Sequence, residues 1–552
     1  MKHRSMLELV TLANLTDHLG LARGEQVAVD LADPLCLQGF EMRFWTYEDI
    51  ARFVSKASCA LKEVGVSEGE SVIVCMSNGF DTCLMALAVI RCGARVVPIS
   101  RQSSADELGF IAGDCGAVML VSDDKVLKRL GRSLKRAWES LKGVLIGPGV
   151  SREGAPEEML GEGVGCWRLS ELMERESAGV AYALDQDEVC AIFYTSGTTG
   201  KPKGAMLTSG TIMGGVKARG WMLRIRSPIQ MRLLIALPVA HIMGFATTLL
   251  PMLAGVTIRY HAWFDAKRVL DDLEEGEIDF FVGVPSMYEL LMREGASGRD
   301  LRGVKVFGSA ADVMPGDQIR RFKGYGRSLR WGSVEVPALF VEAYGSVELS
   351  GAALVRLSLP WMTPTKDGFL GMALPGYKVR IRDEEGRNLA IGQEGELQVK
   401  GPGVLKGYLG KKSAGVVEGG WLRTGDIAKR SGSGLIKFVG RRKEVIKVGG
   451  YSVFPAEVEA VMLEHPAVSG CAVVGIPDQV KGSIPVAVVV LLEDSGVCEA
   501  ELRDWMRGRI APYKAPRRVM EVSREEMPYG PTGKIKKRLL VDLIKVEFDS
   551  GA

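Results

Sequence analysis

Residues 194–204 read Tyr194-Thr195-Ser196-Gly197-Thr198-Thr199-Gly200-Lys201-Pro202-Lys203-Gly204 and directly follow a strand-like apolar run at 189–193. The three glycines let the backbone approach a ligand closely, the four hydroxyls can donate to phosphate oxygens, and the two lysines supply positive charge. It is not a Walker loop, because Thr195 stands where that motif needs glycine and Pro202 follows the lysine in place of Ser or Thr. A plain surface loop is the alternative, but this order of residues favours a polyphosphate-binding loop.

Helix-like and strand-like segments alternate around this loop. The stretches 47–63 and 80–92 predict helices, and the short β-branched runs at 71–75 and 94–98 predict buried strands. The same order returns downstream as a strand, a helix and a strand at 279–284, 286–293 and 304–307. This alternation predicts an α/β fold of layered, mostly parallel sheets.

The pattern changes near Gly368. Short alternating segments, closed by Gly-Pro-Gly at 401–403, predict a β-rich subdomain over about 368–438. Beyond the charge run at 441–444 the pattern is α+β again, with helices expected at 455–463 and 500–510 and strands at 472–475 and 486–492. We therefore expect an N-terminal domain over 1–440 and a C-terminal domain over 441–552.

Composition excludes several other classes of protein. A formal charge of +3 gives no reason to expect a nucleic-acid partner. Ten cysteines without a CxxC pair favour reduced thiols over disulfides or zinc, and no signal-peptide core precedes Asp17, so we expect a cytoplasmic protein. The uncharged stretch 233–258 is divided by Pro238 and Pro251, which favours a buried strand and a core helix over a transmembrane segment.

The 194–204 segment resembles the signature loop of the adenylate-forming superfamily, which includes acyl-CoA synthetases, firefly luciferases and peptide-synthetase adenylation domains. The resemblance continues in order across nearly the whole chain and is greatest to fatty acyl-CoA synthetases. It implies a large α/β domain and a small mobile C-terminal domain. It also implies that ATP is bound by Thr195, Ser196, Gly197, Thr198, Thr199, Gly200, Lys201 and Lys203, with Thr195 among the catalytic residues.

An acyl site is implied by Pro238-Val239-Ala240-His241-Ile242-Met243-Gly244-Phe245, which resembles the family's PxxHxxG segment. A lone histidine in an apolar run is usually a core residue, and only the matched spacing favours a catalytic and substrate-binding role for His241. Phe245 stands where long-chain members often carry an aromatic gate. The small residues Gly308, Ser309 and Ala310 resemble the segment against which adenine and the acyl chain pack; their alternative is a tight turn after a strand.

An adenine and metal site is implied by Ala343-Tyr344-Gly345-Ser346-Val347-Glu348, which resembles the family's YGxTE motif. Tyr344, Gly345, Ser346 and Val347 would line the nucleotide, Ser346 would also face the acid, and Glu348 would ligate Mg²⁺. Val347 departs from the family's threonine, so a hydroxyl normally offered to the α-phosphate is missing.

The remaining motifs, which fall near and beyond the predicted domain boundary, resemble the family's TGD motif, its hinge with the following loop, and its catalytic-lysine segment, and the roles below are what that resemblance implies; the alternatives are an ordinary turn at 424–426 and a solvated surface turn at 441–444. Asp426 of Thr424-Gly425-Asp426 would bind the ribose, because one carboxylate can accept from two hydroxyls. Arg441 would contact ribose or α-phosphate, and Lys443 would be the hinge. The loop carrying Lys447, Gly449, Gly450 and Tyr451 would face the pantetheine of coenzyme A. Lys534 of Pro531-Thr532-Gly533-Lys534 would be the catalytic lysine.

The resemblance implies a ligase that uses ATP, Mg²⁺ and coenzyme A to activate a small carboxylic acid through an acyl-adenylate. The apolar 242–250 segment and the small residues at 308–311 suit a medium- or long-chain fatty acid. Three alternatives stay open: an aryl-acid substrate, a carrier-protein thiol as acceptor, and a catalytically weak homologue that binds acyl ligands or nucleotide. Oligomeric state and a peripheral membrane contact also stay open.

Overall fold

The computed structural model describes residues 10–35, 41–130, 133–134, 141–147, 164–174, 179–195, 202–220, 231–275, 277–331, 334–362, 368–410, 416–448, 451–478, 481–492, 495–529 and 535–550. The chain divides into two compact units. The first comprises Met1–Lys366, Gly371–Lys378 and Val399–Leu422, and the second comprises Asp367–Leu370, Val379–Gln398 and Arg423–Ala552. The predicted boundary at about residue 441 stays a prediction.

The first unit contains two large sheets. The order of strands in the first sheet, from the β2 edge, is β2 (Phe44–Thr46), β1 (Val27–Leu31), β11 (Thr257–Tyr260), β10 (Arg232–Ile235), β12 (Phe280–Gly283), β13 (Val306–Ala310), β16 (Leu339–Ser346), β17 (Gly351–Ser358) and β18 (Phe369–Ala373). Neighbours from β1 to β16 run parallel, as the strand–helix alternation predicted. At the start of this order β2 pairs antiparallel with β1, and at its end β17 pairs antiparallel with both β16 and β18.

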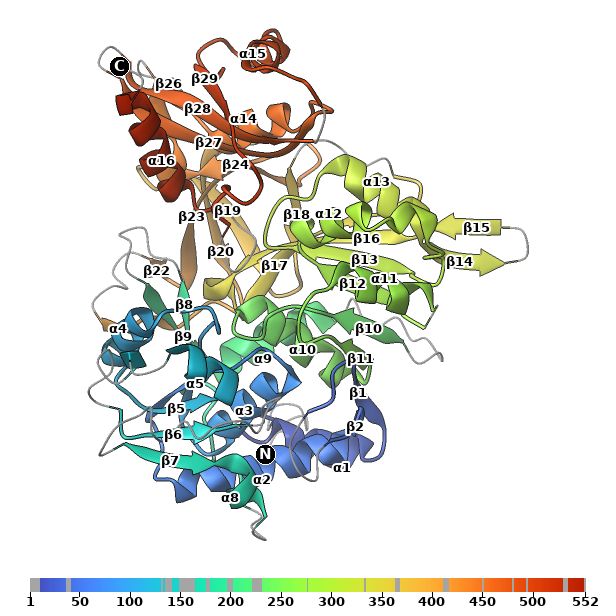
Figure 1. The fold of residues 1–552 in the computed structure, drawn as a ribbon, viewed down its shortest axis with the longest axis vertical. Helices are drawn as coiled ribbons and strands as arrows, with labels where there is room; N and C mark the ends of the chain where they lie inside the picture. The colour runs from blue at the N-terminus through green and yellow to red at the C-terminus, as the bar shows by residue number, and fades with distance from the viewer. Residues whose placement is uncertain are drawn as a thin grey trace. The chain divides into compact units, whose positions relative to one another are not determined.

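The second sheet carries the strand that precedes the glycine- and threonine-rich loop. Its order is β7 (Gly165–Arg168), β6 (Gly143–Ile146), β5 (Ala117–Ser122), β3 (Ser71–Cys75), β4 (Arg95–Pro98), β8 (Val189–Thr195), β9 (Lys203–Thr208) and β21 (Gly407–Tyr408). The strands from β7 to β8 are parallel, whereas β9 returns antiparallel to β8. A separate hairpin, β14 (Arg327–Trp331) with β15 (Val334–Pro337), projects from this unit (Figure 1).

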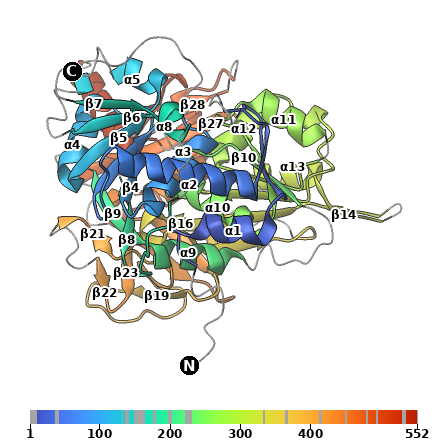
Figure 2. The ribbon, with the colours of Figure 1, turned by 90° about the horizontal axis from the view of Figure 1, so that it is seen from below.

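Helices connect the parallel strands. They are α1 (Leu15–Arg23), α2 (Tyr47–Glu63), α3 (Phe80–Arg91), α4 (Ala105–Cys115), α5 (Asp124–Leu130), α8 (Leu169–Met173), α9 (Ser209–Arg219), α10 (Ile242–Ala254), α11 (Ala266–Glu274), α12 (Pro285–Arg293) and α13 (Gly316–Tyr325). Helices α1, α2 and α3 lie side by side (Figure 2). Helix α2 begins at a capping box, in which Thr46 and Asp49 each accept a hydrogen bond from the other's backbone N–H. Its buried stripe, including Ile50, Phe53 and Ala57, follows the helical period.

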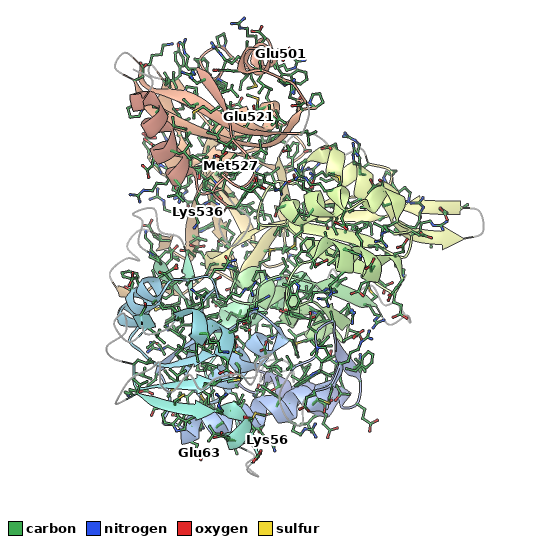
Figure 3. The ribbon with its side chains drawn as sticks, in the orientation of Figure 1. Lys56, Glu63, Glu501, Glu521, Met527 and Lys536 are labelled. Atoms are coloured by element: carbon green, nitrogen blue, oxygen red, sulfur yellow. The ribbon has the colours of Figure 1, made fainter. Side chains whose placement is uncertain are left out.

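The second unit has a smaller sheet with a buried core on each face. The order is β26 (Tyr451–Val453), β25 (Ile446–Val448), β28 (Gly482–Leu491) and β27 (Val468–Asp478), with β29 (Arg518–Glu521) beside β28. One face packs on α14 (Pro455–Met462) and α15 (Glu499–Met506), and the other on α16 (Lys537–Ser550). Met527 lies in the core under α16, and Glu521 ends β29 (Figure 3).

Further strands at this end of the chain are β19 (Lys378–Arg382), β20 (Glu394–Lys400), β22 (Val417–Glu418), β23 (Trp421–Arg430) and β24 (Ile436–Arg441). One expected helix is shorter than predicted: α15 ends at Met506 rather than at residue 510, because Arg507 takes an extended conformation and Gly508 a positive φ of 75°. In the described part of the chain, no helix is both long and apolar enough to span a bilayer.

Candidate functional site

The stem of the glycine- and threonine-rich loop is a strand pair. Thr195 at the end of β8 lies opposite Lys203 at the start of β9, while Ser196, Gly197, Thr198, Thr199, Gly200 and Lys201 fall outside the described residues. The Tyr194 hydroxyl donates to Asp114 Oδ2 at 2.9 Å, and this contact fixes β8 against α4. A Cβ on Gly204 would lie 2.8 Å from Leu409 Cδ1, so only glycine fits without moving a neighbour. Both ends of the loop are therefore firmly held.

The segment around His241 forms a tight turn into α10. A Cβ on Gly244 would stand 2.1 Å from the Pro238 carbonyl oxygen, which explains why the PxxHxxG spacing ends in glycine. Burial lowers the pKa of His241, so its imidazole is neutral at pH 7. Its Nε2 is buried and has no hydrogen-bond partner among the described residues. Such an atom is suited to bond a substrate oxygen.

Asn78 fixes this turn from the opposite side, and sequence reasoning missed it. Its Oδ1 accepts from the Val239 backbone N–H at 3.0 Å, and its Nδ2 donates to the Ala262 carbonyl oxygen. Asn78 has a positive φ of 63°, a conformation that asparagine tolerates better than most residues. The Asn-Gly pair at 78–79 is a turn signal in the sequence, but nothing local points to its contact with residue 239.

Phe245, the expected acyl gate, is fully buried in α10. Its ring lies 5.9 Å from the ring of Phe193, centroid to centroid. The contact joins α10 to β8, the strand that leads into Thr195. In this structure Phe245 is thus a packing residue between the acyl and phosphate segments, and its role as a gate stays a prediction.

The segment expected to pack on adenine and the acyl chain ends β13. Gly308 is buried, and a Cβ there would stand 2.9 Å from Phe280 Cε2. The Ser309 side chain is 3% exposed, and its Oγ has no hydrogen-bond partner among the described residues. Ala310 closes the strand, and Ala311 follows with a φ of 76°, which L-residues adopt rarely. The strand therefore ends in the tight turn that was the alternative reading, and one buried hydroxyl is available for a ligand.

Tyr344, Gly345 and Ser346 end β16, the neighbour of β13. A Cβ on Gly345 would lie 1.9 Å from the Gly351 carbonyl oxygen, so the backbone of β17 passes directly over this position. Val347 and Glu348 follow in a short 3-10 turn, and both are half-buried. β13 and β16 therefore bring the two predicted adenine segments to the same edge of the sheet.

Glu342 is a second residue that sequence reasoning missed. It lies opposite Ser309 in the strand register, and Arg356 Nη1 is 3.3 Å from its Oε2. Burial raises the pKa of Glu342 to about 7, and the charge of Arg356 opposes that shift. Glu342 and Tyr344 are two residues apart on one strand and share a face, which is the only signal in the sequence that links them.

Asp426 and Arg441 are brought together within the second unit. They lie opposite each other in β23 and β24, with Arg441 Nε 3.4 Å from Asp426 Oδ1. Asp426 is 6% exposed, and its backbone N–H donates to Thr424 Oγ1 at 3.1 Å. The Thr-Gly-Asp turn thus carries a buried carboxylate beside a guanidinium, an arrangement suited to the two hydroxyls of a ribose.

The hinge and pantetheine segments lie further along the same unit. Lys443 is exposed in the 442–444 turn, and Lys447 Nζ donates to Ser452 Oγ at 2.7 Å. Tyr451 is 60% exposed and stacks on Tyr513 with ring centroids 4.7 Å apart. Gly449, Gly450 and Lys534 lie outside the described residues. The roles expected of all these residues stay predictions.

Glu348 has the chemistry of a magnesium ligand. Tyr408 on β21 donates to its Oε1 at 2.5 Å, and a carboxylate has a second oxygen that can contact an ion. Magnesium commonly takes one or two protein carboxylates together with substrate phosphates. The residues present therefore fit the ion.

Two family models cover most of the chain. The AMP-binding enzyme model matches residues 19–409, and the model of the AMP-binding enzyme C-terminal domain matches residues 457–534. Feruloyl-CoA synthase from Amycolatopsis sp is 30% identical over 89% of this chain and 92% of its own length. Long-chain-fatty-acid–CoA ligase FadD13 from Mycobacterium tuberculosis is 28% identical over 90% and 92%, respectively.

The fold also matches solved structures. The o-succinylbenzoate CoA synthetase of Bacillus subtilis, in complex with its acyl-adenylate intermediate, superposes with a TM-score of 0.78 at 24% identity over 96% of this chain and 97% of that one. Three observations indicate the same family: the resemblance of the 194–204 segment, the two family models and the relatives. The chain therefore belongs to the AMP-binding enzyme family and, within it, to the AMP-forming CoA ligases.

Proposed function

We propose that this protein is an ATP-dependent fatty acid–CoA ligase that forms an acyl-adenylate and pyrophosphate, then acyl-CoA and AMP. The observation that carries the choice of acid is an apolar face of the first sheet. Val282, Gly308 and Val341 form one row across β12, β13 and β16, and Leu357 continues it on β17. None of these four residues is ionisable, so the row itself offers an apolar surface to an alkyl chain.

The side chains on the two faces of these strands differ in how deeply they are buried. Phe281, Phe307 and Phe340 are fully buried on the face that packs against α11, α12 and α13. On the opposite face Phe280, Val282, Val306, Leu339 and Val341 are only half-buried, and Leu357 is 38% exposed. Gly308 has no side chain, and the half-buried Phe280 ring lies over this position, so movement of that ring would open space at the middle of this face. A half-covered apolar surface beside a small residue is typical of a site for an apolar ligand.

The chemistry follows from the groups available. An acid carboxylate oxygen attacks the α-phosphorus of ATP, the bond to the β-phosphate oxygen breaks, and pyrophosphate leaves. Two anions meet in this step, so cations must stabilise the charge: Lys203 on β9 and Lys534 would supply it. Magnesium on Glu348 would neutralise phosphate charge when bound. The neutral imidazole of His241 would orient the acid, and the coenzyme A thiol would then attack the acyl carbon and expel AMP.

The preference of the enzyme for its acid can be tested with fatty acids of increasing length. Each methylene that leaves water contributes about 0.8 kcal/mol, which is about fourfold in kcat/KM. We expect kcat/KM for AMP formation with coenzyme A to rise about fourfold per methylene from butanoate until the apolar face is filled. Val282→Thr keeps the shape of the side chain but adds a hydroxyl, so it should lower kcat/KM for decanoate and longer acids while sparing butanoate. A flat profile over the fatty acids, with feruloyl-type acids turned over fastest, would establish the aryl-acid alternative instead.

The acceptor is tested with the same enzyme. Coenzyme A should release AMP from the acyl-adenylate at a far higher rate than a phosphopantetheinyl carrier protein. The opposite order would assign the protein to carrier-protein loading. Binding of ATP and acid without pyrophosphate release would favour the binding homologue, for which Val347 is the supporting feature.

Val347→Thr restores the hydroxyl that the family motif usually carries. The side chain is half-buried in the 3-10 turn before Leu349, and threonine is close to valine in shape. We expect acid-dependent pyrophosphate exchange to stay at the wild-type rate or to rise. A large loss of exchange would show that the pocket is built around valine.

A further inference from the structure

The carboxylate expected to bind magnesium is held by a residue far away in the sequence. Tyr408 donates its hydroxyl to Glu348 Oε1 at 2.5 Å, although 60 residues separate the two. The Tyr408 side chain is buried, with 8% of the residue exposed. A phenol hydroxyl is protonated at neutral pH, so Tyr408 is the donor and the Glu348 carboxylate is the acceptor. A charge-assisted hydrogen bond of this length restricts the carboxylate strongly.

Two further hydrogen bonds join the segments that carry Tyr408 and Glu348. The Leu405 N–H donates to the Glu348 carbonyl oxygen at 2.9 Å, and Ser350 Oγ donates to the Gly403 carbonyl oxygen at 2.9 Å. These two bonds fix the 403–408 segment along the turn that carries Glu348. Tyr408 therefore reaches the carboxylate from a backbone that has little freedom to move.

The same tyrosine lies against the stem of the phosphate loop. Tyr408 pairs with Ala205 in the β21–β9 register, and the Leu409 N–H donates to the Gly204 carbonyl oxygen at 2.9 Å. Lys203 Nζ lies 5.8 Å from the centroid of the Tyr408 ring, in the range of a cation–π contact. Tyr408 thus touches a cation expected to meet phosphate and a carboxylate expected to meet the metal.

We propose that Tyr408 is a positioning residue for magnesium: it holds Glu348 by Oε1 and so directs Oε2 toward an ion bound to the ATP phosphates beside Lys203. The proposal rests on the proposed function, because it takes Glu348 as the magnesium ligand. Partners that orient a metal-binding side chain typically contribute about 10- to 100-fold to metal affinity. Tyr408 should therefore set the concentration at which magnesium saturates the enzyme.

Tyr408→Phe removes the hydroxyl and keeps the ring over Lys203. We expect the Mg²⁺ concentration for half-maximal pyrophosphate exchange to rise about tenfold, with turnover recovering at saturating Mg²⁺. Binding of Mn²⁺ in the presence of ATP, followed by electron paramagnetic resonance, should weaken by the same factor without any turnover being measured. Tyr377→Phe is the matched control, because the Tyr377 hydroxyl donates to the Leu349 carbonyl oxygen at 3.2 Å and not to the carboxylate. It should leave both readings unchanged.

Glu348→Gln separates this inference from the proposed function. If Glu348 is the ligand, Glu348→Gln alone weakens Mn²⁺ binding, and adding Tyr408→Phe weakens it no further. If Tyr408→Phe lowers exchange while Mn²⁺ affinity and half-saturation by Mg²⁺ stay at the wild-type values, Tyr408 is not a positioning residue, and the proposed function stands. If Glu348→Gln itself leaves Mn²⁺ binding intact, Glu348 is not the ligand, and the proposed metal site fails together with this inference.

Discussion

Lys534→Ala should lower acid-dependent pyrophosphate exchange by about 10²- to 10³-fold, the range seen when a group that stabilises transition-state charge is removed. The acid and the triphosphate are both anionic, and the lysine would place a cation where negative charge builds at the α-phosphorus. In the second half-reaction the coenzyme A thiol attacks the acyl carbon and AMP leaves. No second anion has to approach the α-phosphorus in this step, so it does not need this cation. Formation of acyl-CoA from a presynthesised acyl-adenylate should therefore stay within about twofold of wild type.

A matched lysine lies close by for this test. Lys536 is exposed at the start of the C-terminal helix region (Figure 3), and its backbone N–H donates to the Pro528 carbonyl oxygen at 2.7 Å. Lys536→Ala removes the same charge but should leave both half-reactions unchanged. An equal loss in both half-reactions with Lys534→Ala would contradict the idea that the small domain uses this lysine only for adenylation.

Gly345→Ala should weaken binding of AMP by about a hundredfold. A Cβ at this position would stand 1.9 Å from the Gly351 carbonyl oxygen and 2.6 Å from Ala352 Cα, so two paired strands must separate. Overpacking of this kind costs about 1–3 kcal/mol, and about 1.4 kcal/mol corresponds to each tenfold in affinity. The strain falls on the pairing of β16 with β17 directly after Tyr344. Adenine is expected to bind at this place. Isothermal titration with AMP measures the loss without requiring turnover.

The control for Gly345→Ala is Gly324→Ala. Gly324 lies in α13, and nothing stands within 4 Å of a Cβ placed there, so alanine should be accepted and AMP binding should not change. Both variants should also be compared by thermal unfolding. Unaltered AMP affinity in a Gly345→Ala protein that unfolds at a lower temperature would show that β16 does not carry the nucleotide.

Much of the fold could be predicted because the local signals agree with the final environment. The helix expected at 47–63 and the strand expected at 71–75 are confirmed as α2 and β3 with the same ends. In the first case a capping box marks the start, and in the second a continuous apolar run is buried on both sides. The strand and helix on either side of Pro238 are confirmed as β10 and α10. The ends of these elements are set by residues that lie within a few positions of them in the sequence.

Features set by distant contacts could not be predicted. β1 lies between the edge strand β2 and β11, and β11 begins more than 200 residues later; no local pattern encodes the pairing of β1 with β11. Sequence separation of this size leaves the partner of a strand open.

The same limit applies to the site. The motifs around His241, Tyr344 and Asp426 were visible because each is contiguous in the sequence. The groups that hold them, Asn78 behind His241 and Tyr408 behind Glu348, come from other parts of the chain and carry no local pattern. Sequence reasoning thus found the residues expected to touch ligands and missed the residues that position them.

The most direct test of the whole account is a crystal structure with ATP and Mg²⁺ bound. We predict that the triphosphate lies against the backbone and cations of residues 195–203, that the adenine packs beside Gly308 and Tyr344, and that the ion contacts Glu348. A nucleotide bound elsewhere, with the 195–203 segment making no phosphate contact, would contradict the account.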